Sequence, residues 1–235
     1  MHLKEFVPPI VVRGLKAIFV KKETKEGERI FNSYESAIAE CKSGYEEDSL
    51  VTVVYEKTKR YRDALSQKPL RVDMSSLRTF VGLSLPNSGK NLNVLDFGGA
   101  CGAHYFLAKS LFVDRVRLRW HVVETPKMVN IARNLETDEL KFYDNLEKAT
   151  NELGKIDIVF TSGALQYVPK PYEMLVKLTE CGASSLFITR VGLSTLTNEF
   201  IVVQTSNLSS NGPGGGRNPN RDERRYYSIS SNFCS

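Results

Sequence analysis

The sequence predicts an α/β protein built on a doubly wound, Rossmann-like parallel sheet, with an N-terminal helical segment and a disordered C-terminal tail. Three observations support this expectation. A strand, a glycine-rich turn and a helix follow one another at 93–112, strands and helices then alternate to residue 189, and Ser, Asn, Gly and Arg dominate the last thirty residues or so. We therefore expect a helical segment at 1–90, an α/β domain at 91–205 and a flexible tail at 206–235. The alternative for the tail is that residues 226–229 supply a last strand of the sheet.

The glycine-rich turn is the most informative local feature. The apolar run at 93–97 includes Asp96 and leads into Gly98–Gly102, where Gly98, Gly99 and Gly102 are glycines. Glycines lack a Cβ, so backbone N–H groups in such a turn can approach a ligand closely. The helix expected next adds partial positive charge at its N-terminus. The unit is typical of the opening βα element of a nucleotide-binding domain.

Helical spacing of apolar residues predicts most of the N-terminal segment. After an irregular, charged stretch to about residue 30, apolar residues recur near helical spacing at 34–45. Further helices are expected at 50–65 and 75–85, before a Pro-Asn-Ser-Gly turn.

The α/β domain is predicted element by element from its alternating pattern. Thr125 and Pro126 indicate a helix start, with Thr as N-cap and Pro in the first turn. Gly182 is a plausible end for the last helix. The expected strands are 92–97, 117–123, 140–143, 156–161 and 185–189, the expected helices are 103–112, one from 126, 145–153 and 171–181, and 200–204 could add a strand.

Composition excludes several classes of protein. Hydrophobic residues make up 41% and charged residues 25% of the 235 residues, which is ordinary for a globular protein. The net charge of +5 comes from scattered Lys and Arg flanked by acids, a pattern that does not favour nucleic-acid binding. The four cysteines are far apart, so neither disulfides nor a metal site is expected. No stretch is long and apolar enough for a membrane span, and we expect a cytoplasmic protein.

Two ligand classes compete for the turn. A dinucleotide fingerprint needs a first glycine where this chain has Phe97. The Asp96 carboxylate would repel a pyrophosphate, but it can accept hydrogen bonds from the amino group of a sulfonium cofactor, S-adenosylmethionine. Glu124 ends the next strand, where a carboxylate can accept both ribose hydroxyls. A tight βα turn without any ligand remains the alternative for each feature taken alone.

The segment Val94–Gly102 resembles the first motif of class I S-adenosylmethionine-dependent methyltransferases, with Ala100 in place of the middle glycine. Several segments are also similar to a bacterial family assigned as methyltransferases and associated with surface-polysaccharide biosynthesis. The similarity covers about residues 30 to 205 and does not include the tail. The segments are 31–37, Gly44-Tyr45, 96–105, 120–126 and Thr189-Arg190.

This resemblance implies S-adenosyl-L-methionine as cofactor. The glycine turn would line the methionine portion and the ribose, Asp96 would bind the amino group, and Glu124 would hold the ribose diol. Asp144 could receive the adenine amino group or cap a helix. The implied cofactor-binding residues are Asp96, Gly98, Gly99, Ala100, Gly102, Glu124, Asp144 and Ser162.

The implied reaction is methyl transfer to an oxygen or nitrogen of a small-molecule acceptor, such as a sugar or glycan intermediate. His104 is a candidate general base or a polar group packed near the cofactor, and Tyr167 a candidate for the acceptor pocket or the core. Arg190 could hold an acidic or phosphorylated acceptor. The alternatives are a nicotinamide-dependent oxidoreductase and a non-catalytic cofactor-binding module.

Overall fold

The computed structural model describes residues 30–41, 44–67, 73–86, 89–112, 115–194, 200–213 and 225–234. The irregular segment expected before residue 30 lies outside these ranges. None of the helices in the described part of the chain is long and apolar enough to cross a membrane.

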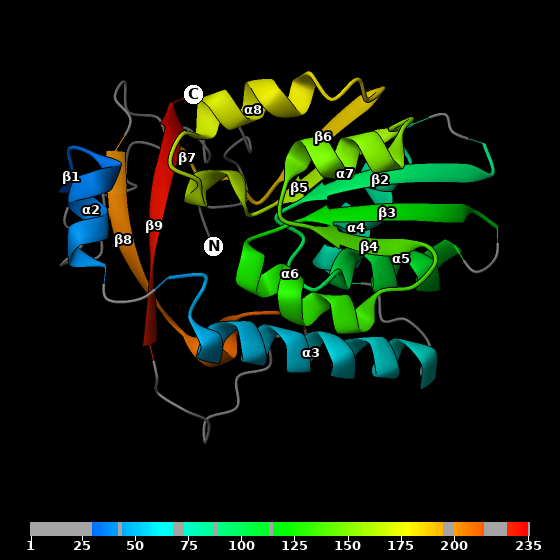
Figure 1. Ribbon diagram of the computed structural model, residues 1–235, viewed down its shortest axis with the longest axis horizontal. Helices are drawn as coiled ribbons and strands as arrows, with labels where there is room; N and C mark the ends of the chain where they lie inside the picture. Colours follow the sequence, from blue (N-terminus) through cyan, green and yellow to red (C-terminus); the bar gives the residue numbers. More distant parts are fainter. Residues whose placement is uncertain are drawn as a thin grey trace, which may run out of the picture.

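The core is a sheet of five parallel strands, drawn side by side in Figure 1. Their order is β4-β3-β2-β5-β6, so the strand order reverses between β2 and β5. Ligands of such sheets bind outside the carboxyl ends of the strands at the point of reversal. We call the edge at which these strands end the carboxyl edge. The strands are β2 (Asn91–Phe97), β3 (Arg117–Val123), β4 (Leu140–Tyr143), β5 (Ile158–Ser162) and β6 (Ser185–Thr189).

Helices cover both faces of this sheet, which confirms the doubly wound α/β fold. On one face, α5 (Ala103–Phe112) and α6 (Pro126–Ala132) pack with buried side chains of β2 and β3. On the other face lie α7 (Leu146–Leu153) and α8 (Pro171–Thr179). Both strand faces are therefore buried, as a parallel sheet requires.

The N-terminal helices add a further layer. Helix α3 (Asp48–Gln67) packs on α5 and α6, and α4 (Met74–Leu83) packs on α5. Figure 1 shows α3 running along the bottom of the molecule, beneath α6. The short helix α2 (Tyr34–Glu40) begins at Ser33, whose hydroxyl accepts the N–H of Ser36.

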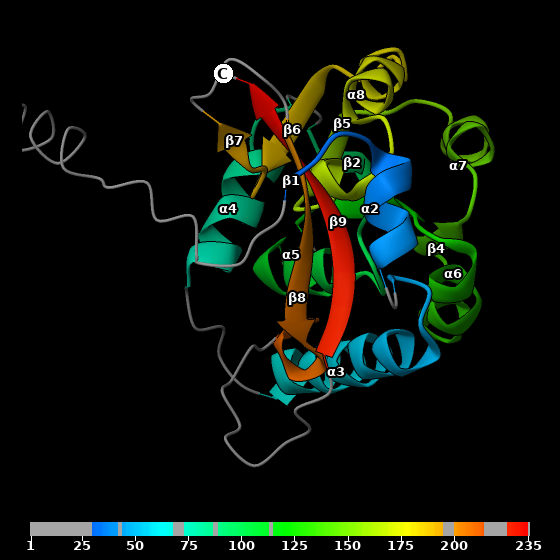
Figure 2. The ribbon, with the colours of Figure 1, turned by 90° about the vertical axis from the view of Figure 1, so that its left-hand side faces the viewer.

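A second, four-stranded sheet has the order β1-β8-β9-β7. Figures 1 and 2 show β8 and β9 standing across the side of the molecule where the parallel strands end. This position brings residues from both ends of the chain to the carboxyl edge. The strands are β1 (Ile30–Phe31), β7 (Leu193–Ser194), β8 (Phe200–Asn207) and β9 (Arg225–Cys234).

The structure corrects two expectations drawn from the sequence. The tail at 206–235 is not disordered throughout, because β8 extends to Asn207, a 3-10 helix follows at Leu208–Ser210, and β9 pairs antiparallel with β8 from Asn207↔Arg225 to Phe200↔Asn232. The segment at 1–90 is not purely helical, because β1 pairs with β8. The composition of the whole tail predicted disorder, but the segment that forms β9 contains Tyr226, Tyr227, Ile229 and Phe233, residue types that favour strands, and β8 supplies its hydrogen-bonding partner.

This pairing predicts that removing residues 225–235 destabilises the protein. Strand β8 would lose its antiparallel ladder with β9, and β7 would lose its parallel partner. We expect the free energy of unfolding to fall by about 1–3 kcal/mol, which corresponds to about 2–4 °C in Tm per kcal/mol. Removal of Ser235 alone is the control. An unchanged Tm after the longer truncation would mean that β9 contributes nothing to the fold.

Candidate functional site

A buried carboxylate lies beneath the glycine turn. Asp96, near the end of β2, has no exposed surface, and its Oδ2 accepts a hydrogen bond of 3.1 Å from Nε1 of Trp120. His104, at the start of α5, places Nδ1 3.6 Å from the same oxygen. The other oxygen, Oδ1, has no hydrogen-bond partner. A buried carboxylate of this kind is costly unless a donor or a positive charge completes it.

The turn itself follows a path that favours glycine. Gly98, Ala100 and Gly102 have φ angles of 71°, 50° and 78°, in the left-handed region. A Cβ on Gly98 would overlap the Cβ of Ala164, and a Cβ on Gly99 would overlap the Asp96 carboxylate. These glycines are therefore required by contacts within the protein, before any ligand is considered. Ala100 is the one non-glycine residue of the turn that takes the left-handed conformation.

Glu124 ties the end of β3 to this turn. Its Oε1 accepts the N–H of Ala100 at 3.0 Å, and its Oε2 accepts the N–H of Thr125 at 2.8 Å. Loss of hydration raises the pKa of Glu124 above its usual value, the two N–H donors oppose this shift, and the negative charge of Asp96 adds to it. Each carboxylate oxygen keeps a second lone pair, so the group can still accept hydrogen bonds from a ligand.

The loop after β5 completes the carboxyl edge. Ser162 ends the strand, and the N–H of Gly163 donates to the Thr189 carbonyl at 2.9 Å. Tyr167 lies in the 3-10 helix η3 (Leu165–Tyr167), and its hydroxyl donates to Oε1 of Gln204 on β8 at 3.2 Å. Its ring meets that of Tyr45 edge-on, with centroids 5.1 Å apart. Tyr167 thus joins the second sheet and the segment before α3 to the carboxyl edge.

Buried polar atoms without a hydrogen-bond partner are concentrated at this edge. Such atoms are uncommon in folded proteins, and each one calls for an explanation. Within the described ranges, all five belong to residues near the carboxyl ends of β2, β3 and β5 or in the segments that follow these strands. They are Asp96 Oδ1, His104 Nδ1, Thr125 Oγ1, Thr161 Oγ1 and Gln166 Oε1. Their common location indicates a site that a polar ligand completes.

The residues predicted from the sequence lie along one edge. Asp96, Glu124 and Ser162 stand at or next to the carboxyl ends of β2, β3 and β5. Asp144 follows β4 and is exposed, and it does not cap α7, whose N-cap is Asn145. Thr125 occupies the N-cap position of α6 as expected, but its side chain makes no capping hydrogen bond.

Sequence reasoning placed Gln166 at the site, within the segment 162–167 after β5, but missed Trp120 and Thr161. Thr161 was predicted only as the end of a strand, and its position next to the point of strand reversal was the available signal. Trp120 pairs in register with Val94, two residues before Asp96, but no sequence pattern reveals that its indole N–H reaches the carboxylate.

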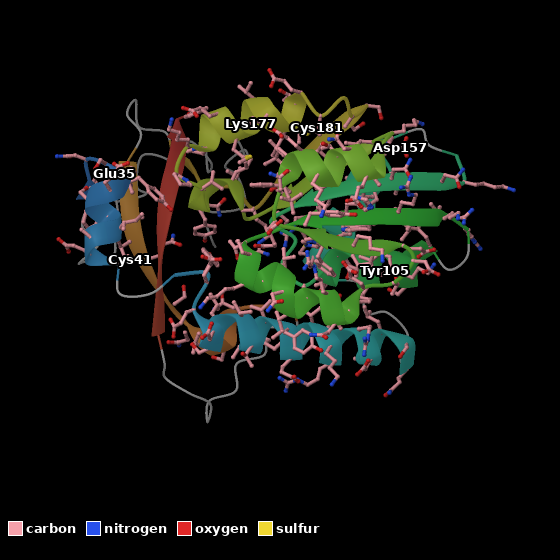
Figure 3. The ribbon with its side chains drawn as sticks, in the orientation of Figure 1. Glu35, Cys41, Tyr105, Asp157, Lys177 and Cys181 are labelled. Atoms are coloured by element: carbon pink, nitrogen blue, oxygen red, sulfur yellow. The ribbon has the colours of Figure 1, made fainter. Side chains whose placement is uncertain are left out.

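Other polar clusters lie away from the carboxyl edge. Tyr105 donates to Oε2 of Glu139 at 2.9 Å, and loss of hydration raises the pKa of Tyr105 to about 12. Asp157 precedes β5 and accepts hydrogen bonds from Asn93. Figure 3 shows Tyr105 and Asp157 toward the opposite side of the sheet from β9. We assign these groups to the stability of the fold.

The described residues contain no group of three or more His, Cys, Asp or Glu side chains placed to hold a metal ion. Cys101 and Cys181 are free thiols. Loss of hydration, with the nearby charge of Glu124, raises the pKa of Cys101 to about 12, so this thiol in the glycine turn stays protonated near neutral pH.

Several solved methyltransferase structures are distantly similar to the chain. No protein-family model and no curated protein matches the chain. A methyltransferase complex with the Trm112 activator from Haloferax volcanii matches at 20% identity over 53% of this chain, with a TM-score of 0.32, and the match spans about half (54%) of that chain.

Two further structures match over more of their length. Precorrin-6y C5,15-methyltransferase from Geobacter metallireducens matches at 16% identity over 71% of this chain and 91% of its own, with a TM-score of 0.38. The CcbJ methyltransferase from Streptomyces caelestis matches at 13% identity over 77% and 81%, with a TM-score of 0.40. At these values the likeness does not extend to an activity or a substrate.

The left-handed conformation of Ala100 predicts that Ala100→Gly stabilises the protein. This conformation costs an L-residue about 1–2 kcal/mol, and the greater freedom of glycine in the unfolded chain offsets about 0.5–1 kcal/mol of the gain. We expect the free energy of unfolding to rise by up to about 1 kcal/mol in urea denaturation. Ala103→Gly, at the start of α5, is the control and should lower it. Equal losses in both variants would contradict the strain at Ala100.

Proposed function

We propose that the protein is an S-adenosylmethionine-dependent methyltransferase. The observation that carries the proposal is the group of five buried, unpartnered polar atoms at the carboxyl edge, where the carboxylates of Asp96 and Glu124 border the glycine turn. A ligand suited to this edge must bring hydrogen-bond donors and a positive charge. S-adenosylmethionine offers an ammonium group, a ribose diol and a positively charged sulfur that makes its methyl group transferable.

The residues of the edge fit the parts of this cofactor. Oδ1 of Asp96 is free to accept from the ammonium group, while Oδ2 is held by Trp120. Glu124 keeps lone pairs for the ribose hydroxyls. The turn Gly98, Gly99, Ala100 and Gly102 would line the methionine portion, with Ser162 and Asp144 at the neighbouring strand ends.

A nicotinamide-dependent oxidoreductase is the second candidate, and the electrostatics disfavour it. The pyrophosphate of a dinucleotide would have to sit at a turn whose floor is the buried Asp96 carboxylate. No lysine or arginine of the described residues forms an ion pair with Asp96, so its negative charge is not neutralised there.

We further propose that His104 accepts the proton that leaves the acceptor oxygen or nitrogen during methyl transfer. Its Nδ1 faces the Asp96 carboxylate, and its ring lies 5.0 Å from that of Phe160. This arrangement would orient the imidazole and leave Nε2 for the acceptor. Tyr167, held by Gln204 and Tyr45, would shape the acceptor side of the edge. The sugar or glycan nature of the acceptor is part of this proposal and derives from the family resemblance.

Calorimetry with S-adenosylhomocysteine tests the cofactor. Asp96→Asn keeps the size of the side chain and an oxygen for Trp120 but removes the charge, so we expect binding to weaken by about 1.5–3 kcal/mol, at least tenfold. The control is Asp157→Asn, another buried aspartate but one that lies before β5, and its affinity should equal that of the wild type. Binding of NADH in preference to S-adenosylhomocysteine would instead support the oxidoreductase.

The role of His104 predicts a loss of rate without a loss of cofactor affinity. With an acceptor that supports turnover, His104→Gln should lower kcat by about 10²–10⁴-fold, because the glutamine side chain cannot accept the proton that leaves the methyl acceptor. Its affinity for S-adenosylhomocysteine should stay within about threefold of wild type. His121→Gln, which changes a buried imidazole bonded to the Ala149 carbonyl, is the control. A kcat near the wild-type value would mean that His104 is not the base and contributes only to packing.

A further inference from the structure

The carboxyl edge is divided by charge. Acidic side chains stand at or next to the ends of β2, β3 and β4, namely Asp96, Glu124 and Asp144. On the other side of the reversal point, the residue that follows β6 is Arg190. The acidic half suits a cationic cofactor, and the other half presents a positive charge.

Arg190 is held in an unusual backbone conformation. Its φ is 58°, in the left-handed region, where a long side chain is uncommon. Its carbonyl oxygen accepts a hydrogen bond of 3.2 Å from Nε2 of Gln166. Residues kept in such conformations are concentrated at functional sites, where the surrounding structure fixes them.

The side chain of Arg190 lies over the loop that borders the glycine turn. A Cβ placed on Gly163 would be 3.6 Å from Cβ, Nε and Cζ of Arg190, so the arginine extends along this glycine. The next residue, Ala164, packs against Gly98. The guanidinium is thereby placed beside the proposed cofactor site rather than turned away from it.

No acidic side chain of the described residues forms an ion pair with this arginine. Its side chain is exposed, so the guanidinium is accessible to a ligand. Close by, Oε1 of the buried Gln166 has no hydrogen-bond partner. An anionic ligand that also carries a hydroxyl or amino group would pair with the guanidinium and donate a hydrogen bond to this oxygen.

We propose that Arg190 binds an oxyanion of the methyl acceptor, so that the substrate class is an acceptor bearing a phosphate or a carboxylate. This inference rests on the proposed function in that it treats the bound anion as the methyl acceptor. Binding of an anion by Arg190 does not itself depend on that function. The fork of N–H groups on a guanidinium matches both oxyanions. Arg190 is then a specificity-determining residue that aligns the acceptor beside the glycine turn.

The test is titration of the protein, saturated with S-adenosylhomocysteine, with inorganic phosphate and separately with acetate at low ionic strength. We expect one of the two anions to bind the wild type, and Arg190→Gln to weaken that binding about tenfold or more. Arg190→Lys should retain part of it, because the charge remains and the fork is lost. Affinity for S-adenosylhomocysteine should be unchanged in each variant.

The control is Arg117→Gln, which removes an exposed arginine at the opposite, amino end of β3. Its anion affinity should stay within twofold of wild type. If Arg190→Gln fails to fold, Arg190→Asn gives the same measurement, since Asn tolerates the left-handed region. Equal anion affinity in wild type and Arg190 variants, or binding of neither anion by the wild type, overturns the inference.

Failure of the proposed function would be seen separately. If the wild type does not bind S-adenosylhomocysteine, the cofactor assignment is wrong, and the same anion titrations on the ligand-free protein still decide the role of Arg190.

Discussion

The burial of the Asp96 carboxylate is the constraint on which the rest of the site depends. A carboxylate without exposed surface demands donors, and the protein supplies one from Trp120 and places His104 within 3.6 Å. Room for it exists because Gly99 has no Cβ. One oxygen is nevertheless left without a partner, so the cost of burial is only partly offset by the protein itself. Binding energy from a cationic ligand can supply the remainder.

The second sheet contributes contacts to the carboxyl edge of the parallel sheet. Tyr167, on the loop after β5, bonds to Gln204 of β8 and meets Tyr45 from the segment before α3. Residues from both ends of the chain therefore border the site that the parallel sheet creates.

The strands and helices of the α/β domain were predictable because each satisfies its own local rule. Segments rich in apolar and β-branched residues between turn signals predict strands, and the strands Arg117–Val123, Leu140–Tyr143 and Ser185–Thr189 have the predicted bounds. Asp96 and Glu124 were predictable because strand ends meet at one edge. Strand β9 was expected only as the alternative at 226–229, because its pairing depends on β8, which is separated from it by more than fifteen residues of polar and glycine-rich chain. The roles of Trp120 and Gln166 depend on side-chain contacts that no spacing reveals.

The glycines of the turn carry a more general lesson about such motifs. Gly98 is required by Ala164, Gly99 by Asp96, and Gly102 by its left-handed backbone and the nearby side chains of β4. The fold alone would therefore select these glycines, whatever ligand is bound. Ala100 accepts the same backbone conformation with a side chain, so a glycine is not strictly needed at every left-handed position. What distinguishes a ligand site from a tight turn here is the set of buried polar atoms left without partners, because the fold gains nothing from leaving them unbonded.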